Sequence, residues 1–348
     1  MQRAIRRPGA RRVPPRALAL GAAAIAILAL LAAGEVGATL LIAGVEPNEP
    51  AGAAASPAPP GSAGVIAIAP SPTGVIVGSL PAPDSATVPR VAHVFVIVME
   101  NKEYGSIVGS SAAPYINSLI ARYGLATNYD AVAHPSEPNY FALWAGTTRG
   151  VTTDGTYNFT SGATLASQLE SKGLSWHVAA ENVPLGCYKG STASGGEDGP
   201  GTYARKHEPA ISWTAVSGSS TRCSRITDFS HFNPNSGSFW LIVPNLCNDM
   251  HDCSVAHGDA FLKGFLPKIL TSAAFTNGVV LLTWDEGTTS TGGGGHVATL
   301  VISPLAKTGY RSATSHNHYS LLHTAEELLG LGCIADACSA NDLRELFR

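Results

Sequence analysis

The stretch "HVFVIVMEN", residues 93–101, decides the fold. After its opening His, residues 94–99 are all apolar, and most of them are β-branched. A short continuous run of this kind is typical of a strand buried on both faces, as in a parallel sheet covered by helices. Two polar residues, Glu100 and Asn101, follow at once, so they lie where the strand should end.

Strand and helix patterns alternate from this run to the C-terminus. Further strands are predicted at 174–181, 238–245, 278–284 and 297–304, and helices at 113–124, 163–173, 259–275 and 318–332. This alternation predicts an α/β fold in which helices sandwich a mostly parallel sheet. Residues 182–238 are polar and rich in Gly and Ser, so we expect a long loop region there, held by a disulfide, that could cover a site.

The N-terminal 44 residues have a different composition. Residues 1–16 hold six arginines and no acid, and residues 17–44 are apolar apart from Glu35. A basic stretch before an apolar run predicts a cleaved secretory signal peptide or an uncleaved signal-anchor in the membrane. In both cases the chain after residue 44 would be extracytoplasmic, either secreted or anchored.

Residues 45–90 separate this segment from the rest. They hold ten of the 23 prolines and are rich in Ala, Gly and Ser. This composition predicts either an extended, semi-rigid linker or a disordered segment whose only role is reach. The remaining residues, 91–348, have the length of a single catalytic domain.

The charge of residues 91–348 excludes one class of partner. The chain has 22 Lys and Arg and 25 Asp and Glu; residues 1–90 take seven and four of these, which leaves 15 and 21 and a net charge of −6. A nucleic-acid-binding protein needs a basic face, so no nucleic-acid partner is expected. An acidic enzyme that acts on anionic substrates must neutralise charge locally, and a bound cation does so.

All six cysteines lie in this domain. An even number in an exported chain indicates disulfides. Cys247–Cys253 and Cys333–Cys338 are close in sequence and would leave Cys187 with Cys223, although spacing alone does not prove this pairing. A zinc–cysteine site is the alternative, but no CxxC pair supports it.

Polar residues follow several predicted strands, at the edge where sites of open α/β sheets form. Glu100 and Asn101 follow the first strand, and Asp285 and Glu286 follow the strand at 278–284. Each pair alone could simply end a strand and begin a turn. Together, three carboxylates and an amide oxygen suit a divalent metal cation, because without one the converging carboxylates would repel each other.

Ser136 lies in a rigid corner ahead of a predicted helix. Pro135 and Pro138 restrict the backbone around it, and Pro138 suits the first helical turn. The hydroxyl could be an ordinary N-cap of that helix. Alternatively it is a nucleophile at a helix N-terminus, which favours a phosphate group.

Several of these motifs together resemble a known family. The segments are "FVIVMENKEYGSIVG", "HPSEPNYFALWAGTT", "NLCNDMHDC", "TWDEG", "GGHVATLVISP" and "HNHYSLLHTAEELLGL". They resemble the bacterial phosphoesterase family of secreted acid phosphatases and phospholipase-C-like enzymes, in the alkaline-phosphatase-like superfamily. The resemblance covers most of residues 93–332 in order.

The resemblance implies a fold and a set of roles. The fold would be a three-layer α/β/α sandwich, alkaline-phosphatase-like, with Ser136 as nucleophile. Gly287 departs from many relatives, which have His there, and this puts a second, histidine-rich metal site in doubt. The implied metal ligands are Glu100, Asn101, Asp285 and Glu286. The implied proton donors are His296 and His318, and the implied pocket residues are His134, Asn139, Asn245, Asp249, His251 and Asp252.

The leading hypothesis is an exported, metal-dependent phosphomonoesterase that forms a phosphoserine. Its partner would be a phosphate ester, which could be a small molecule or a phosphoinositide headgroup. A phospholipase-C-type phosphodiesterase could use the same residues, and the domain is short for that group. A non-catalytic envelope binding module is the third hypothesis, and Ser136 beside the four implied ligands argues against it.

Overall fold

The computed structural model describes residues 87–194 and 201–348. The predicted signal or anchor segment, 1–44, and nearly all of the predicted linker, 45–90, lie outside the described residues. Within those two described ranges, no helix is both long enough and apolar enough to cross a membrane.

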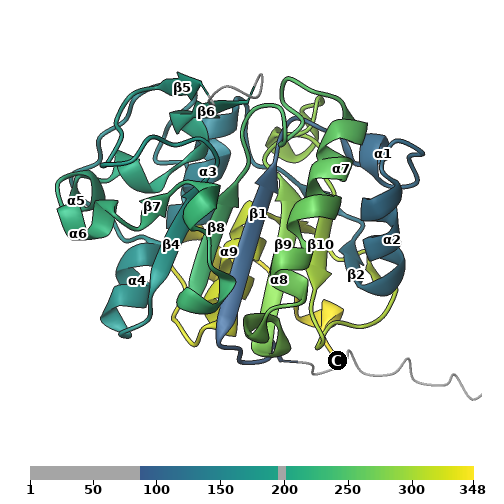
Figure 1. Ribbon diagram of the computed structural model, residues 1–348. Helices are drawn as coiled ribbons and strands as arrows, with labels where there is room; N and C mark the ends of the chain where they lie inside the picture. The colour runs from purple at the N-terminus through teal and green to yellow at the C-terminus, as the bar shows by residue number, and fades with distance from the viewer. Residues whose placement is uncertain (1–86, 195–200) are drawn as a thin grey trace, which may run out of the picture. The chain divides into compact units, whose positions relative to one another are not determined.

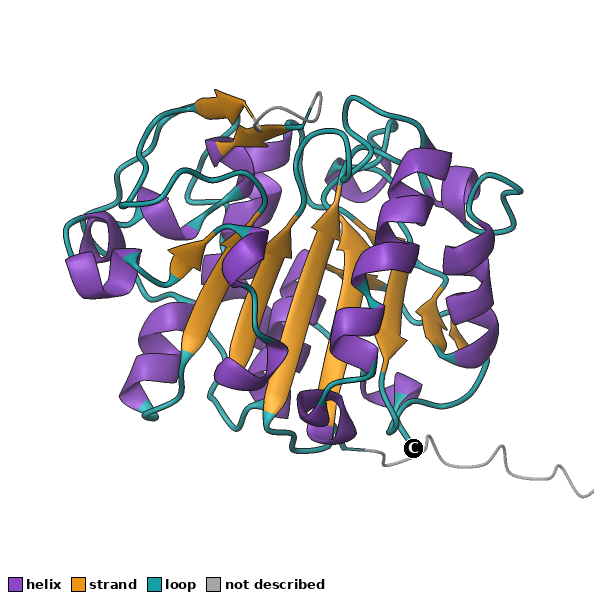
Figure 2. Cartoon of the chain, in the orientation of Figure 1, coloured by secondary structure: helices purple, strands orange, loops and turns teal. Residues whose placement is uncertain are grey.

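An eight-stranded sheet forms the centre of the described domain (Figures 1 and 2). Its strands are β1 (His93–Met99), β2 (Gly124–Ala126), β4 (Trp176–Ala180), β7 (Ile226–Thr227), β8 (Phe239–Val243), β9 (Gly278–Trp284), β10 (Thr299–Ile302) and β11 (Arg311–Ser312). Their order is β11-β2-β10-β9-β1-β8-β4-β7. Only β10 runs antiparallel to its neighbours, so the prediction of a mostly parallel sheet is confirmed.

The direction of β10 follows from its connection to β9. That connection holds a 3-10 turn, η6 (Thr291–Gly293), and no α-helix. A parallel neighbour would need a crossover, which is usually a helix, whereas an antiparallel one does not. Two small sheets complete the strands: β3 (Tyr129–Asp130) pairs with β12 (His316–Asn317), and β5 (Thr192–Ser194) pairs with β6 (Thr202–Ala204).

Helices cover both faces of the sheet. The α-helices are α1 (Tyr104–Ile107), α2 (Pro114–Arg122), α3 (Ser136–Ala145), α4 (Leu165–Ser171), α5 (Thr214–Ser217), α6 (Ser220–Cys223), α7 (Val255–Phe265), α8 (Pro267–Leu270) and α9 (His318–Leu328). The other 3-10 turns are η1 (Arg205–His207), η2 (Ala210–Ser212), η3 (Phe229–His231), η4 (Pro234–Ser236), η5 (Ala273–Asn277), η7 (Ala335–Ser339) and η8 (Arg344–Leu346). In Figure 1, α7 and α8 lie in front of the sheet and α9 lies behind it.

Successive residues of β8 show how the core fills both layers. Phe239 packs on Trp144 of α3, with ring centroids 6.3 Å apart. Trp240 points to the other face, where it contacts Phe232 at 4.9 Å, and Phe232 contacts Phe265 of α7 at 5.4 Å. This alternation along a buried strand confirms the predicted α/β/α sandwich.

Two predicted segments differ in detail. The predicted helix at 259–275 begins four residues earlier, because Ser254 caps its first turn by accepting the N–H of His257, and it breaks before Pro267. The predicted loop region at 182–238 contains β5, β6, β7, α5, α6 and four 3-10 turns. The three expected disulfides are present: Cys187–Cys223, Cys247–Cys253 and Cys333–Cys338.

Candidate active site

Ser136 is the first residue of α3, and every residue of this helix is buried. Its hydroxyl does not cap the helix, since the N-cap position is Pro135 and no side chain caps it. Ser136 Oγ instead lies 3.2 Å from Glu100 Oε2 and 3.4 Å from Glu286 Oε1. The hydroxyl is therefore directed at two carboxylates that come from different strand ends.

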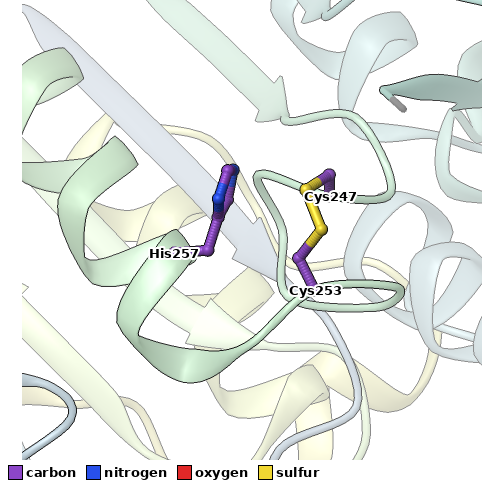
Figure 3. Close-up of side chains that lie close together, drawn as sticks. All are labelled: Cys247, Cys253 and His257. Carbon is purple, nitrogen blue, oxygen red and sulfur yellow. A yellow bond between two sulfur atoms is a disulfide. The ribbon is translucent and has the colours of Figure 1, made fainter. Parts of the chain in front are cut away.

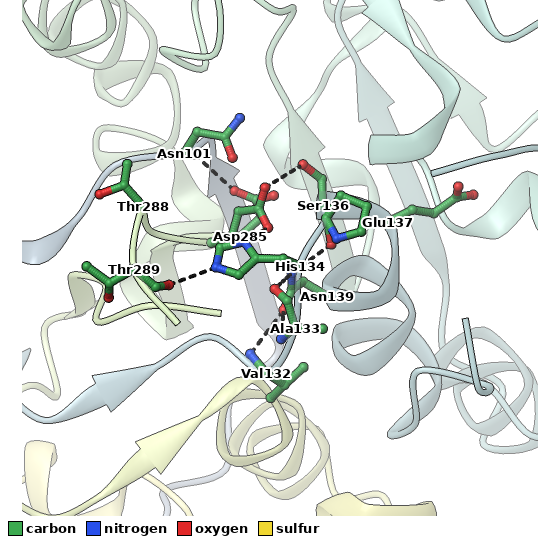
Figure 4. A network of polar contacts seen from close by, with 12 residues as sticks. Asn101, Val132, Ala133, His134, Ser136, Glu137, Asn139, Asp285, Thr288 and Thr289 are labelled. Carbon is green, nitrogen blue, oxygen red and sulfur yellow. Dashed lines mark hydrogen bonds and ion pairs between the residues drawn. The ribbon is translucent and has the colours of Figure 1, made fainter. Parts of the chain in front are cut away.

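The ends of β1 and β9 bring these carboxylates together. The strands are parallel neighbours, and Met99 pairs with Trp284, so the residues that follow them are adjacent. Asn101 has a positive φ of 53°, and its backbone N–H donates to Asp285 Oδ1 at 3.1 Å. Figure 4 shows Asn101 and Ser136 on either side of Asp285. The sharp turn after β1 thus fixes Asp285 beside the nucleophile candidate.

His207 completes the cluster and was not predicted from the sequence. Its Nε2 lies 3.4 Å from Glu100 Oε2, and its Nδ1 lies 3.7 Å from Asp249 Oδ2. The ring stacks on Tyr140 with a centroid distance of 5.1 Å, and the Tyr140 hydroxyl donates to Glu100 Oε1. His207 comes from η1, inside the segment that we expected to be loop, where no periodic pattern marked it.

Burial governs the charges of this cluster. It raises the pKa of Glu100, Asp249 and Glu286, and it raises the pKa of Asp285 to about 7. The neighbouring carboxylates add to the effect: Asp285 acts on both Glu100 and Asp249. Burial likewise holds the pKa of His207 well below its usual value, with Lys206 and His251 adding to it. The part of these shifts that comes from Asp285 is the repulsion expected of converging carboxylates.

The cluster has the donors that a divalent cation needs. One donor atom each from Glu100, His207 and Asp249 lies within 4.8 Å of the others, and all three residues are buried. Asp249 Oδ2 and Asp285 Oδ2 are buried and have no hydrogen-bond partner among the described residues. Such orphaned oxygens next to an imidazole fit a divalent ion. This set shares Glu100 with the predicted ligand set and places Asp285 beside it.

A second group of possible ligands can be dismissed. Cys247, Cys253 and His257 lie close together, as Figure 3 shows. The two sulfur atoms form a disulfide, so neither is available as a thiolate. The alternative of a zinc–cysteine site therefore fails, and the disulfide instead closes the loop that carries Asp249.

His134 holds the second carboxylate next to Ser136. Its Nδ1 lies 2.5 Å from Glu286 Oε2, and its Nε2 donates to the carbonyl of Thr289 at 2.7 Å (Figure 4). Burial alone would lower the pKa of His134, but the hydrogen bonds to Thr289 and Glu286 outweigh it, and the pKa is raised. His134 and Glu286 thus form an ion pair whose carboxylate also contacts Ser136.

The two predicted proton donors lie in other surroundings. His318 is buried, with Nε2 donating to the carbonyl of Asp285 at 2.5 Å and Nδ1 accepting from Tyr129 at 2.9 Å. Burial lowers its pKa to about 4. His296 stacks on Tyr104 and its Nε2 lies 3.0 Å from Thr127 O, and neither partner belongs to the carboxylate cluster. Both ring nitrogens of His318 and the Nε2 of His296 are thus engaged in hydrogen bonds.

Two predicted pocket residues hold the backbone. Asn139 accepts the N–H groups of Val132 and Ala133 at 3.0 and 3.1 Å, which shapes the turn before Ser136 (Figure 4). Asn245 accepts the N–H groups of Cys247 and Asn248, which shapes the loop before Asp249.

The remaining predicted pair, His251 and Asp252, lies at the edge of the cluster. The two side chains contact each other at 2.7 Å. The ring of His251 lies 6.0 Å from that of His207, and half of the Asp252 side chain is exposed. The pair therefore stands between the buried cluster and solvent.

Comparisons with known proteins show what this chain is similar to. A model of the Phosphoesterase family matches residues 109–332. The chain is 35% identical over 270 residues to a phosphatidylinositol-3-phosphatase of Mycobacterium tuberculosis, covering 76% of this chain and 85% of that protein. It is 29% identical over 259 residues to an acid phosphatase of Aspergillus fumigatus, covering 72% of this chain but only 57% of the fungal protein.

Solved structures share the fold at low sequence identity. The lipoteichoic acid synthase LtaP of Listeria monocytogenes has a TM-score of 0.53 and 11% identity, covering 74% of this chain and 78% of that one. A Vibrio parahaemolyticus protein of the alkaline phosphatase superfamily has a TM-score of 0.50 and 12% identity, covering 74% and 70%. The predicted alkaline-phosphatase-like fold is thereby confirmed.

Proposed function

Because this chain belongs to the Phosphoesterase family and is a phosphoric ester hydrolase, we propose that it is an exported, metal-dependent phosphomonoesterase that forms a phosphoserine at Ser136. The observation that carries this proposal is the contact of Ser136 Oγ with Glu100 and Glu286 at the start of a buried helix. A binding module would have no need to direct a buried hydroxyl at two carboxylates.

Each residue of the site has a proposed role in the transfer of the phosphoryl group. Ser136 Oγ attacks phosphorus, and the bond from phosphorus to the ester oxygen breaks. Of the two carboxylates that Ser136 Oγ contacts, Glu100 belongs to the group that would hold the cation, so Glu286 accepts the proton of Ser136. The His134–Glu286 pair then returns a proton to the leaving oxygen. His296 and His318, the donors that the family resemblance implies, are the alternative for this step. Water hydrolyses the phosphoserine and releases phosphate.

A divalent cation held by Glu100, His207 and Asp249, with Asp285 beside it, would neutralise charge on the phosphoryl oxygens. The predicted set of Glu100, Asn101, Asp285 and Glu286 is the alternative. Titration calorimetry on Asp249→Asn and Glu286→Gln separates the two. Loss of ion binding in Asp249→Asn alone supports the first set, and loss in Glu286→Gln alone supports the second.

The substrate class follows from the similarity to a phosphatidylinositol-3-phosphatase: a phosphorylated inositol lipid is a candidate beside small monoesters. Export is supported by the three disulfides, which form in oxidising compartments. Phosphate release from vesicles that carry phosphatidylinositol 3-phosphate tests the lipid substrate. The N-terminus of protein recovered from the culture medium distinguishes secretion from anchoring.

The central test compares an aryl phosphate monoester with an aryl diester, with chelator and metal add-back. We expect faster monoester turnover, its loss with chelator and its return with one divalent ion. Ser136→Ala should lower kcat by about 1,000-fold or more, whereas Ser118→Ala, an exposed serine on α2, should change nothing. A diester preference would favour the phospholipase-C-type activity, and an active Ser136→Ala would exclude the serine mechanism.

A further inference from the structure

Lys206 is a cationic residue next to the carboxylate cluster. It belongs to η1 and directly precedes His207, which contacts Glu100 and Asp249. Its Nζ lies 2.8 Å from Asp154 Oδ2, and 24% of its side chain remains exposed. The ammonium group is therefore held in one place while still open to a ligand.

Asp154 ties this lysine to the nucleophile's helix. Its other oxygen, Oδ1, accepts the backbone N–H of Glu137 at 3.0 Å, and Glu137 follows Ser136. One carboxylate thus binds both the first turn of α3 and the ammonium group of Lys206. A phosphoryl group on Ser136 would form at this helix end, so Lys206 stands beside it.

The contacts of Lys206 distinguish it from the other lysine near the cluster. Its Nζ forms an ion pair with Asp154 at 2.8 Å, and Asp154 also holds the first turn of α3. The Nζ of Lys102 donates instead to the backbone carbonyl of Met250 at 2.7 Å. Lys206 is therefore the lysine that these contacts tie to the end of the nucleophile's helix.

We propose that Lys206, positioned by Asp154, binds the non-bridging oxygens of the substrate and selects phosphate monoester dianions over diester monoanions. This inference rests on the proposed function and adds the source of its selectivity. A monoester carries close to two negative charges near pH 7, a diester only one. A fixed ammonium group interacts more strongly with the dianion, so it favours the monoester beyond what the metal ion provides.

The test measures kcat/KM for an aryl monoester and an aryl diester in Lys206→Met, Lys206→Arg, Asp154→Asn and the double variant. Lys206→Met should lose about 10- to 100-fold on the monoester and at most about threefold on the diester. Lys206→Arg keeps the charge and should recover most of the monoester activity. Asp154→Asn can still accept the N–H of Glu137 but loses its charge, so it should show a smaller loss of the same kind, mainly in KM.

The double variant should be no worse than Lys206→Met alone, because Asp154 acts through Lys206. Inhibition by inorganic phosphate should weaken in parallel with the monoester loss. Lys189→Met, which removes an exposed lysine elsewhere in the same region, is the matched control. Equal losses on both substrates, or no loss in Lys206→Met, would overturn the inference while leaving the proposed function intact. If the wild-type protein has no monoester activity, the proposed function itself is contradicted.

Discussion

Replacing Asp285 by Asn should stabilise the metal-free protein. The substitution keeps the contacts of this site. In the wild type the N–H of Asn101 donates to Asp285 Oδ1 at 3.1 Å, and the amide oxygen of Asn can accept the same hydrogen bond. The hydrogen bond from His318 goes to the backbone carbonyl of residue 285 and is unaffected. What changes is the second oxygen, Oδ2, which is buried without a hydrogen-bond partner among the described residues.

The size of the effect follows from the pKa of this carboxyl. Burial, with Glu286 adding to it, raises the pKa of Asp285 from 3.8 to about 7. Because the folded-state pKa lies above the unfolded one, the protonated Asp285 carboxyl contributes to the free energy of unfolding. This contribution is fully present below about pH 4 and is lost as the pH rises through about 7. The full loss is about 4 kcal/mol. An amide does not ionise, so Asp285→Asn should gain up to about 4 kcal/mol at pH 8 and little at pH 4.

Denaturant unfolding in chelator at pH 4 and pH 8 measures this gain, with Asp336→Asn, an exposed acid in η7, as control. Adding a divalent ion at 100 times its Kd should stabilise the wild type by about 2.7 kcal/mol and the variant by less. If the variant is less stable than wild type in chelator at pH 8, the buried carboxylates do not repel one another as described. If no divalent ion stabilises the wild type, the cluster does not bind one.

Three further variants test other parts of the fold. Burial raises the pKa of Glu326 to about 8, so Glu326→Gln should raise the free energy of unfolding by about 3–5 kcal/mol at pH 9 but not at pH 4; an equal effect at both pH values would contradict this. Changing both Cys247 and Cys253 to Ser should cost about 2 kcal/mol in chemical unfolding, and no change under non-reducing conditions would show that the bond does not form. Gly146 has φ 66°, and a Cβ there would lie 2.4 Å from the carbonyl oxygen of Ile334. Gly146→Ala should therefore lower the free energy of unfolding by about 1–3 kcal/mol. An unchanged Tm would refute the close approach.

The sheet could be predicted because its central strands are buried on both faces. The predicted strands at 93–99 and 278–284 match β1 and β9 in both bounds, since burial of every residue after His93 in β1 and of all of β9 leaves a nearly continuous apolar pattern. Short edge strands such as β11 and β7 have two residues each, too few for any pattern to show. The antiparallel direction of β10 depends on how its connection folds, which residue periodicity does not encode.

The site was predictable where it follows a strand. Glu100 and Asp285 could be placed together because parallel neighbours end at one edge of the sheet. His207 and Lys206 could not, because they lie in η1, after a hairpin in a region without apolar periodicity. Their approach to the cluster depends on tertiary contacts, such as the stacking of His207 on Tyr140.

The most direct test of the account is to trap the covalent intermediate. Wild-type protein with its metal ion is mixed with an aryl monoester, quenched in acid within the first turnovers, digested and sequenced by mass spectrometry. The account predicts one phosphoryl group on the peptide that contains Ser136, and none on the same peptide from Ser136→Ala. Full turnover with that peptide unmodified, or with the phosphoryl group on His207, would contradict it.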